Sequence, residues 1–189
     1  MPPEVPLFPV HTDQRFALQP FESLPQLADL TISGEISRRG ERLLLRYALQ
    51  GPLDTVLLAP PAPQPCRLDE LWQTTCFELF LACPGQEPYW EFNLSPAGHW
   101  NVYRLESYRR GLAAEAAYQQ LALQVLRDPQ ELRLMLELDL PPGLGADQPL
   151  AAAITAVIQQ RSGLVSYWAL EHGGSEPDFH RREDFRLSL

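Results

Sequence analysis

Residues 89–104, with the sequence YWEFNLSPAGHWNVYR, gather the side chains that are best able to do chemistry. Trp and Tyr rings lie toward both ends of this stretch, and Glu91, Asn93 and Asn101 lie between them. Such rings stack on the apolar C–H faces of sugars, while carboxylates and amides bind hydroxyl groups. The same pattern is also typical of an ordinary hairpin whose aromatic residues pack in a core. The stretch therefore leaves a ligand-binding face and a structural hairpin as open interpretations.

A second candidate chemistry involves two carboxylates, Glu78 and Glu91. Both occupy polar positions in neighbouring runs of alternating polarity, TTCFELFLAC and YWEFNLS, so they could face one another. Two carboxyl groups that flank a groove can hydrolyse a glycosidic bond. Facing like charges are unfavourable, so such a pair implies a ligand, a cation or an arginine between them, and Arg104 and Arg109 are available. Solvated strand residues or ion pairs with arginine are the structural alternative.

The segment EHGGSEPDFH contains the best candidates for metal ligands, His172, Asp178 and His180. Two imidazoles and a carboxylate could bind a transition ion. A Gly-rich loop whose polar groups bond to its own backbone explains the same residues more simply, so we expect no metal site. Calcium is conceivable through the acidic oxygens, but the segment lacks the spacing of an EF-hand.

Composition argues against several classes of function. The chain carries 15 basic residues, all of them arginine, and 24 acidic residues, which gives a net charge of -9. Nucleic acids and anionic membranes require clustered positive charge, so we expect neither as a partner. Without lysine there is no Schiff base and no P-loop lysine. Three scattered cysteines, Cys66, Cys76 and Cys83, do not form a disulfide framework.

The N-terminal sequence, MPPEVPLFPVHTDQRF, lacks the charged start and the apolar stretch of a signal peptide. The chain also contains no apolar run that is long enough to span a membrane. We therefore expect a cytoplasmic protein, and the sequence leaves any protein partner open.

Strands are the elements that must position these residues. Polarity alternates in ERLLLRYALQG, YQQLALQVLRD and ELRLMLELDL, a pattern typical of strands with one buried face. Turn residues between the runs predict hairpins around residues 95–98 and 128–130. The pattern predicts an all-β fold, an antiparallel sandwich. We expect residues 1–26 to form an extended N-terminal arm and residues 27–189 a single domain.

Two segments fit more than one element. Residues 111–124, GLAAEAAYQQLALQ, are rich in alanine and could begin as a helical turn. Residues 150–163, LAAAITAVIQQRSG, form an almost continuous apolar run, which fits either a short helix or a fully buried strand. We favour the strand for the second segment.

Residues 69–111, from DELWQTTCFELFL to YWEFNLSPAGHWNVYRLESYRRG, resemble the core of the DOMON and family 9 carbohydrate-binding module superfamily. Residues 165–185 resemble the end of small stand-alone bacterial DOMON-like proteins. The resemblance implies a β-sandwich of two antiparallel sheets, of the jelly-roll or immunoglobulin-like kind, whose relatives bind sugars or haem. In the carbohydrate-binding relatives, a Trp followed six residues later by a Glu lies at the sugar site, and a second Trp closes over the other face. Trp72 and Glu78 have this spacing, and Trp168 is the candidate for the second ring by its position in the chain.

We therefore expect a non-catalytic module for a small polar ligand, with a sugar as the preferred class. The expected ligand-binding residues are Trp72, Glu78, Glu91, Asn93, Asn101, Arg109 and Trp168. Among these, Trp168 lies in the apolar run YWAL and could equally be a core residue.

Two alternatives remain open. One is a haem-binding redox domain, which the resemblance implies through a Met and a His; here Met135 would pair with His99, His172 or His180. The other is an enzyme that processes sugars with the carboxylates of Glu78 and Glu91. We expect no cofactor for the binding module itself.

Overall fold

The computed structural model describes residues 11–189, which form twelve strands and four short 3-10 helices. The strands are β1 (His11–Pro20), β2 (Thr31–Arg39), β3 (Arg42–Gln50), β4 (Cys76–Ala82), β5 (Tyr89–Leu94), β6 (Trp100–Leu105), β7 (Ala113–Ala114), β8 (Ala122–Asp128), β9 (Glu131–Asp139), β10 (Ala151–Gln159), β11 (Val165–Ala169) and β12 (Leu187–Ser188). The 3-10 helices are η1 (Pro25–Leu27), η2 (Leu53–Thr55), η3 (Leu71–Gln73) and η4 (Arg182–Asp184). No helix among residues 11–189 is long and apolar enough to cross a membrane.

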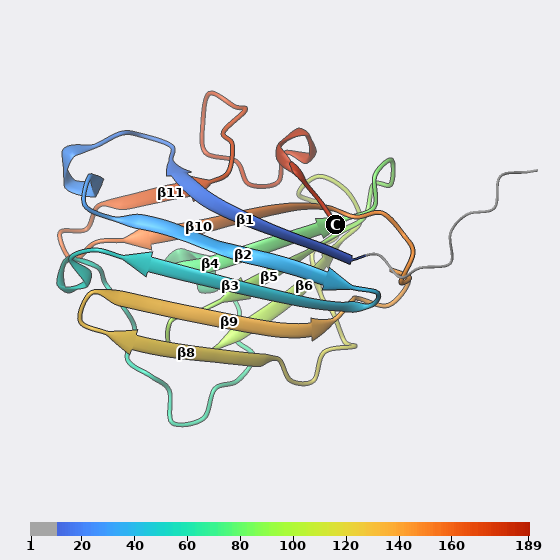
Figure 1. The fold of residues 1–189 in the computed structure, drawn as a ribbon, viewed down its shortest axis with the longest axis horizontal. Helices are drawn as coiled ribbons and strands as arrows, with labels where there is room; N and C mark the ends of the chain where they lie inside the picture. Colours follow the sequence, from blue (N-terminus) through green and yellow to red (C-terminus); the bar gives the residue numbers. More distant parts are fainter. Residues whose placement is uncertain (1–10) are drawn as a thin grey trace, which may run out of the picture.

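The strands form two antiparallel layers that face each other (Figure 1). The front layer has the order β1-β2-β3-β9-β8, and the back layer has the order β11-β10-β4-β5-β6-β7, with β12 beside β10. The two layers are continuous at one edge, where the end of β1 pairs with β11 through Gln19↔Ala169 and Pro20↔Trp168. The prediction of an all-β antiparallel sandwich is confirmed.

The front layer follows the predicted alternation closely. Along β3, Leu43, Leu45, Tyr47 and Leu49 are buried, and the residues between them lie on the outer face. The buried residues join the leucines of β9 and the inner residues of the back layer in one hydrophobic core. Burial of these side chains between the layers is the main force that holds the sandwich together.

The back layer is different, because β4 and β5 are buried on both faces. Phe77, Leu79 and Leu81 point into the main core. On the opposite face, Phe80 joins a second, smaller apolar cluster with Phe185 from the C-terminal segment. The outer face of the back layer is therefore covered by chain from outside the sheet, and a covered face can hold side chains away from bulk water.

The predicted hairpins are confirmed. β5 and β6 form one across the turn at residues 95–98, where Gly98 has φ 93° and the Ser95 N–H donates to the carbonyl of His99. β8 and β9 form the other, in which Asp128 is paired with Glu131. The favoured strand at residues 150–163 appears as β10.

One expectation about elements is corrected, and one segment that fitted more than one element is assigned. Residues 11–20, which were expected within an extended arm, form β1, which pairs with β2 over eight positions and buries Phe16 and Leu18. The sheet therefore begins before residue 27, while residues 1–10 of the expected arm lie outside the described part. Residues 111–124 contain β7 and the start of β8 in place of a helical turn.

Candidate functional site

A cavity of about 510 Å³ opens on the outer face of the back layer, over β4, β5, β10 and β11. Four of the seven predicted ligand-binding residues line it: Trp72, Glu78, Glu91 and Arg109. The remaining wall comes mainly from β11 and the loop that follows it, including Tyr167 and His180. We call this cavity the acidic pocket. Its size falls within the range of about 300–1,000 Å³ that small-ligand sites occupy.

Trp72 forms one aromatic wall of the acidic pocket. It lies in η3, just before β4, and the left-handed backbone of Glu70 (φ 58°) immediately precedes this helix. The indole is half-buried and meets the ring of Tyr103 edge to face, with the ring centroids 5.7 Å apart. Packing against Tyr103 fixes the orientation of the indole, while the ring still lines the acidic pocket.

Glu78 and Glu91 share the floor of the acidic pocket. In the antiparallel pairing of β4 and β5, Glu78 is opposite Asn93 and Phe80 is opposite Glu91, so the two glutamates are diagonal neighbours on one face. Their exposed fractions are only 3% and 4%. The prediction that these two side chains share a face is confirmed.

Burial sets the electrostatics of the two carboxyl groups. It raises the pKa of Glu78 well above the usual range, and the charge of Glu91 raises it further, while a hydrogen bond from Thr155 Oγ1 to Glu78 Oε2 (3.2 Å) opposes the shift. Burial also raises the pKa of Glu91, and two groups oppose it: Asn93, which donates to Glu91 Oε1 at 2.8 Å, and the positive Arg109. The pair therefore ionises less readily than free glutamates do.

His180 lines the acidic pocket and forms an uncharged hydrogen-bonded pair with Tyr89. The Tyr89 hydroxyl lies 2.7 Å from His180 Nδ1 and accepts a hydrogen bond from the backbone N–H of Arg109 (3.2 Å). Burial, together with the charge of Arg109, lowers the pKa of His180 to about 4. The imidazole is therefore neutral near pH 7, and its Nε2 is 4.0 Å from Glu91 Oε2, beyond hydrogen-bonding distance.

Asp178 ties two loops together at the rim. Its carboxylate accepts hydrogen bonds from Tyr108 (2.6 Å), from the guanidinium of Arg109 (2.8 Å) and from the backbone N–H of His180 (3.1 Å). Partial burial opposes ionisation, but the bonds from Tyr108 and Arg109 prevail and lower the pKa of Asp178. The arrangement fixes the position of Arg109 in the wall.

The three candidate metal ligands do not converge. His172 bonds through Nε2 to the carbonyl of Gln19 in β1 (2.9 Å), whereas His180 lines the acidic pocket and Asp178 lies at its rim. Within residues 11–189 there is no group of three His, Cys, Asp or Glu side chains that is placed to hold a metal ion.

Two of the predicted amides lie under the site instead of lining it. Asn93 is fully buried and supports Glu91. Asn101 is also fully buried and bonds to Asp69 (2.9 Å) and Arg67 (2.7 Å). Both residues organise the floor and the neighbouring loop, and neither is in the lining of the acidic pocket.

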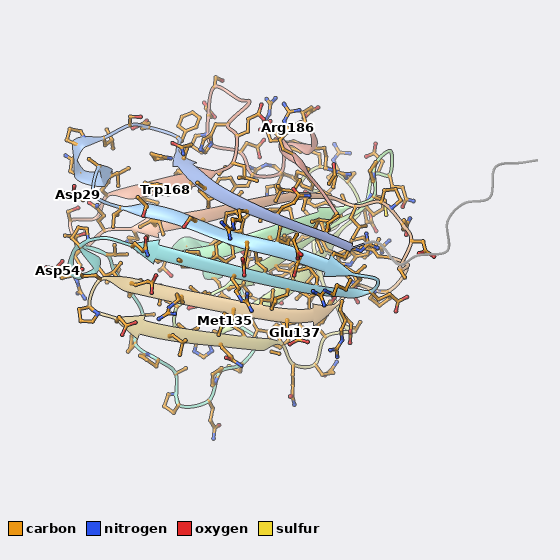
Figure 2. All side chains as sticks on the ribbon, in the orientation of Figure 1. Asp29, Asp54, Met135, Glu137, Trp168 and Arg186 are labelled. Carbon is orange, nitrogen blue, oxygen red and sulfur yellow. The ribbon has the colours of Figure 1, made fainter. Side chains whose placement is uncertain are left out.

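Trp168 lies in the main core, with 2% of its surface exposed, and its indole N–H donates to Ser166 Oγ at 2.9 Å (Figure 2). Successive side chains of a strand point to opposite faces, so the ring that β11 presents to the acidic pocket is Tyr167. The candidate for a second aromatic ring, Trp168, therefore does not line the acidic pocket, whereas its neighbour Tyr167 does. Alternation within VSYWA puts Tyr167 and Trp168 on opposite faces, but the sequence alone does not say which of the two faces the core.

The loop after β11 supplies lining residues that sequence reasoning did not place there. Glu176, Pro177, Phe179 and His180 all line the acidic pocket, and of these only His180 was considered before, as a metal ligand. A Gly-rich loop has no periodicity from which side-chain directions follow, so its chemistry-bearing residues are the only available signal.

The haem alternative requires the side chains of Met135 and a histidine to lie close enough to bind the same haem. Met135 lies on the outer face of the front layer, in β9 between Arg46 and Gln124, and is half-buried there (Figure 2). His180 lies on the outer face of the back layer, so the main core separates the two side chains. His99 bonds with Cys66 beyond the β5–β6 turn, and His172 contacts β1. The structure brings none of these three histidines to Met135.

No protein-family model matches this chain, and no curated protein matches it either. Solved structures with similar folds do exist. A candidate carbohydrate-binding protein from Bacteroides uniformis matches with a TM-score of 0.60 and 14% identity, over 88% of this chain and 83% of that one. A family 9 carbohydrate-binding module from Caldicellulosiruptor kristjanssonii, solved with cellotriose, matches with a TM-score of 0.54 and 9% identity, over 86% of this chain and 74% of that one. At these identities the likeness establishes the fold: the chain has the architecture seen in carbohydrate-binding modules.

Proposed function

We propose that this protein is a carbohydrate-binding module whose ligand occupies the acidic pocket. One observation carries the proposal: a half-buried indole, Trp72, and the carboxyl groups of Glu78 and Glu91 line the same cavity. A sugar ring requires this combination, because its C–H face stacks on an aromatic ring while its hydroxyl groups bond to polar side chains.

Tyr167 and Arg109 add to this support. Tyr167 is an exposed ring on β11, so the pocket has aromatic side chains from two separate elements. The guanidinium of Arg109 keeps donors free beyond its bond to Asp178, and hydroxyl oxygens accept from such donors. The similar fold of known carbohydrate-binding modules is consistent with this function at the coarser level.

Intrinsic Trp fluorescence and isothermal titration calorimetry with a panel of mono- and disaccharides test the proposal. We expect at least one sugar to bind at up to millimolar concentration, and Trp72→Ala to weaken that binding about tenfold or more, since aromatic contacts contribute about 1 kcal/mol beyond their buried area. Trp168→Phe is the matched control, because Trp168 lies in the core and should leave affinity unchanged. No response to any saccharide, or full affinity in Trp72→Ala, would contradict the proposal.

A sugar-processing enzyme is the second candidate, favoured by the meeting of two buried carboxyl groups in one pocket. Glu78 would act as the protonated acid, and Glu91, which Asn93 and Arg109 stabilise as the anion, would be the partner. Release of 4-nitrophenol from 4-nitrophenyl glycosides measures this activity, which Glu91→Gln should abolish; Glu78→Gln should reduce it less, because 4-nitrophenolate leaves with little help from an acid. Sugar binding without turnover of any glycoside would favour the module.

A further inference from the structure

The acidic pocket contains more negative than positive charge. Its lining includes three glutamates, Glu78, Glu91 and Glu176, and one arginine, Arg109. The positive charge of Arg109 is matched by Asp178, to which it bonds at 2.8 Å. His180 does not contribute a cation near neutral pH, since its pKa is about 4. The charge of Arg109 therefore compensates only part of the negative charge and acts on Glu91 alone, and neither buried glutamate has a cation within hydrogen-bonding distance among the described residues.

Each of these glutamates also has bonding capacity directed at the cavity. Glu78 accepts one side-chain hydrogen bond, from Thr155 to Oε2, and its Oε1 has no hydrogen-bond partner among residues 11–189. Glu91 accepts from Asn93 through Oε1, and its Oε2 is 4.0 Å from His180 Nε2, beyond hydrogen-bonding distance. Both side chains are more than nine-tenths buried and line the cavity. Buried acids without a cation destabilise a fold, and such groups are concentrated at ligand sites.

The apolar part of the lining also suits a positively charged ligand. Trp72, Phe80, Tyr167 and Phe179 surround the glutamates with aromatic rings. The face of an aromatic ring carries partial negative charge and attracts cations, most strongly where water is excluded. Carboxylates and ring faces together make a site for an organic cation that also has apolar surface.

We propose that the acidic pocket selects sugars that carry a protonated amino group, with the ammonium seated between Glu78 and Glu91 and the ring stacked on Trp72. This inference rests on the proposed carbohydrate binding and specifies the class of sugar. An ammonium has three donors and no acceptor, so it can bond Glu78 Oε1 and Glu91 Oε2 together and supply the missing charge. A hydroxyl in the same place can bond to either oxygen but brings no charge.

Calorimetric titration of matched sugars tests the inference. Glucosamine, galactosamine and mannosamine are each compared with the parent hexose and with the N-acetylated form, which keeps the nitrogen and removes the charge. We expect at least one amino sugar to bind about tenfold or more tightly than both of its neutral counterparts, which corresponds to about 1.4 kcal/mol.

Isosteric variants show whether the glutamates cause the preference. Glu78→Gln and Glu91→Gln keep the shape of the pocket and remove a charge, so the preference for the amine should shrink at least several-fold while binding of the parent hexose persists. Glu35→Gln is the matched control, because Glu35 lies on β2 in an ion pair with Arg46, is not part of the pocket lining and should retain the preference. Circular dichroism and thermal unfolding establish that each variant is folded.

The possible outcomes separate this inference from the proposed function. If neutral hexoses bind as tightly as their amines, or if Glu78→Gln keeps the full preference, amine selection is overturned and carbohydrate binding stands. If no amino, neutral or N-acetylated sugar binds, both are overturned. Should a glutamine variant fail to fold, the comparison of amine with parent sugar in the unmodified protein still decides the question.

Discussion

Glu78 occupies a place where an ionisable group is costly to the fold. It is enclosed by β4, β5 and β10, with Thr155 as its only side-chain hydrogen-bond donor among the described residues and with Glu91 as its diagonal neighbour. Both the loss of water and the nearby like charge disfavour the anion. If this residue only supported the sheet, an apolar side chain could take its place with no loss of stability. The free-energy cost of burying a carboxyl group here therefore points to a role in binding.

We expect Glu78→Gln to stabilise the unliganded protein, and to do so only at higher pH. The pKa of Glu78 is raised in the folded state, so on raising the pH the unfolded chain loses this proton first. The free energy of unfolding therefore falls as the pH rises above the unfolded pKa of about 4.3. The loss of stability is complete above the folded-state pKa. The gain should be on the order of 1 kcal/mol near pH 8 and close to zero near pH 4. Urea unfolding across this range measures it.

Glu35→Gln is the control for that measurement, since Glu35 lies on β2 in an ion pair with Arg46 whose side chains are roughly half exposed. Its effect should be small at every pH. A Glu78→Gln protein that is equally or less stable than the unmodified protein at pH 8 would show that the carboxylate is stabilised in the folded state by something other than the contacts described.

Side-chain direction was predicted correctly for Glu78 and Glu91 in β4 and β5, and wrongly for Trp168 in β11. Glu78 and Glu91 were correctly placed on one face, because each lies at the parity opposite to the core-facing residues of its strand, such as Phe77 in β4 and Phe92 in β5. In β11 the sequence VSYWA offers an aromatic residue on each face, so composition could not say whether Tyr167 or Trp168 faces the pocket. The difference is set by the register of β11 against β10, where Tyr167 pairs with Val157.

Two loops, residues 106–112 and 170–186, complete the acidic pocket. The carboxylate of Asp178 connects the two loops. Tyr108 and Arg109 from the first loop bond to this carboxylate from the second. Arg109 has a left-handed backbone (φ 53°), which turns the chain so that both side chains reach the same partner. Neither loop has a periodic pattern, so the sequence alone offered no means of bringing them together.

We expect Asp178→Ala to release the two loops from each other while leaving the sandwich folded. Loss of the three hydrogen bonds should speed amide hydrogen exchange in residues 106–112 and 172–181 and weaken ligand binding, with a modest stability loss of about 1–2 kcal/mol. Exchange measured by mass spectrometry localises the effect. Asp128→Ala removes an exposed carboxylate at the β8–β9 turn and serves as the control. Unchanged exchange in both loops would mean that other contacts hold them.

At the scale of the whole molecule, the alternating pattern predicted the fold class but could not predict which strands are neighbours. β4 lies between β5 and β10, and β1 closes the front layer onto β11. Alternation determines which side of a strand is buried, whereas pairing order depends on contacts between distant parts of the chain. The proline-rich start of the sequence concealed β1 for the same reason, since its partner β2 and its core contacts lie beyond the local pattern.

Arginines connect segments that the sheets alone do not join. Arg67 donates to the carbonyls of Val102, Glu115 and Tyr118, and its guanidinium lies over the ring of Trp100. Arg182 binds backbone carbonyls between β4 and β5 in the same way. In this chain without lysine, the planar guanidinium with its five donors acts as a multi-point link between backbone segments.

Arg38 is the most deeply buried of these links and joins both layers. From β2 its fully buried side chain donates to five carbonyls, in the β2–β3 turn, the β9–β10 connection and the C-terminal residue: Gly40, Gly145, Ala146, Gln148 and Leu189. The β9–β10 connection carries the chain from the front layer to the back layer. One side chain thus closes an end of the sandwich.

We expect Arg38→Lys to destabilise the protein by about 3 kcal/mol, because an ammonium has three donors and cannot reach all five carbonyls, some of which would stay buried without a partner. Urea unfolding measures the loss. Arg42→Lys makes the same chemical change at an exposed ion pair with Glu137 and should cost less than about 0.5 kcal/mol. Because Arg38 does not line the acidic pocket, sugar affinity of the folded fraction should be unchanged. Equal, small losses for the two lysine variants would mean that the carbonyls around Arg38 find other donors, and the end of the sandwich would then be closed by its apolar contacts alone.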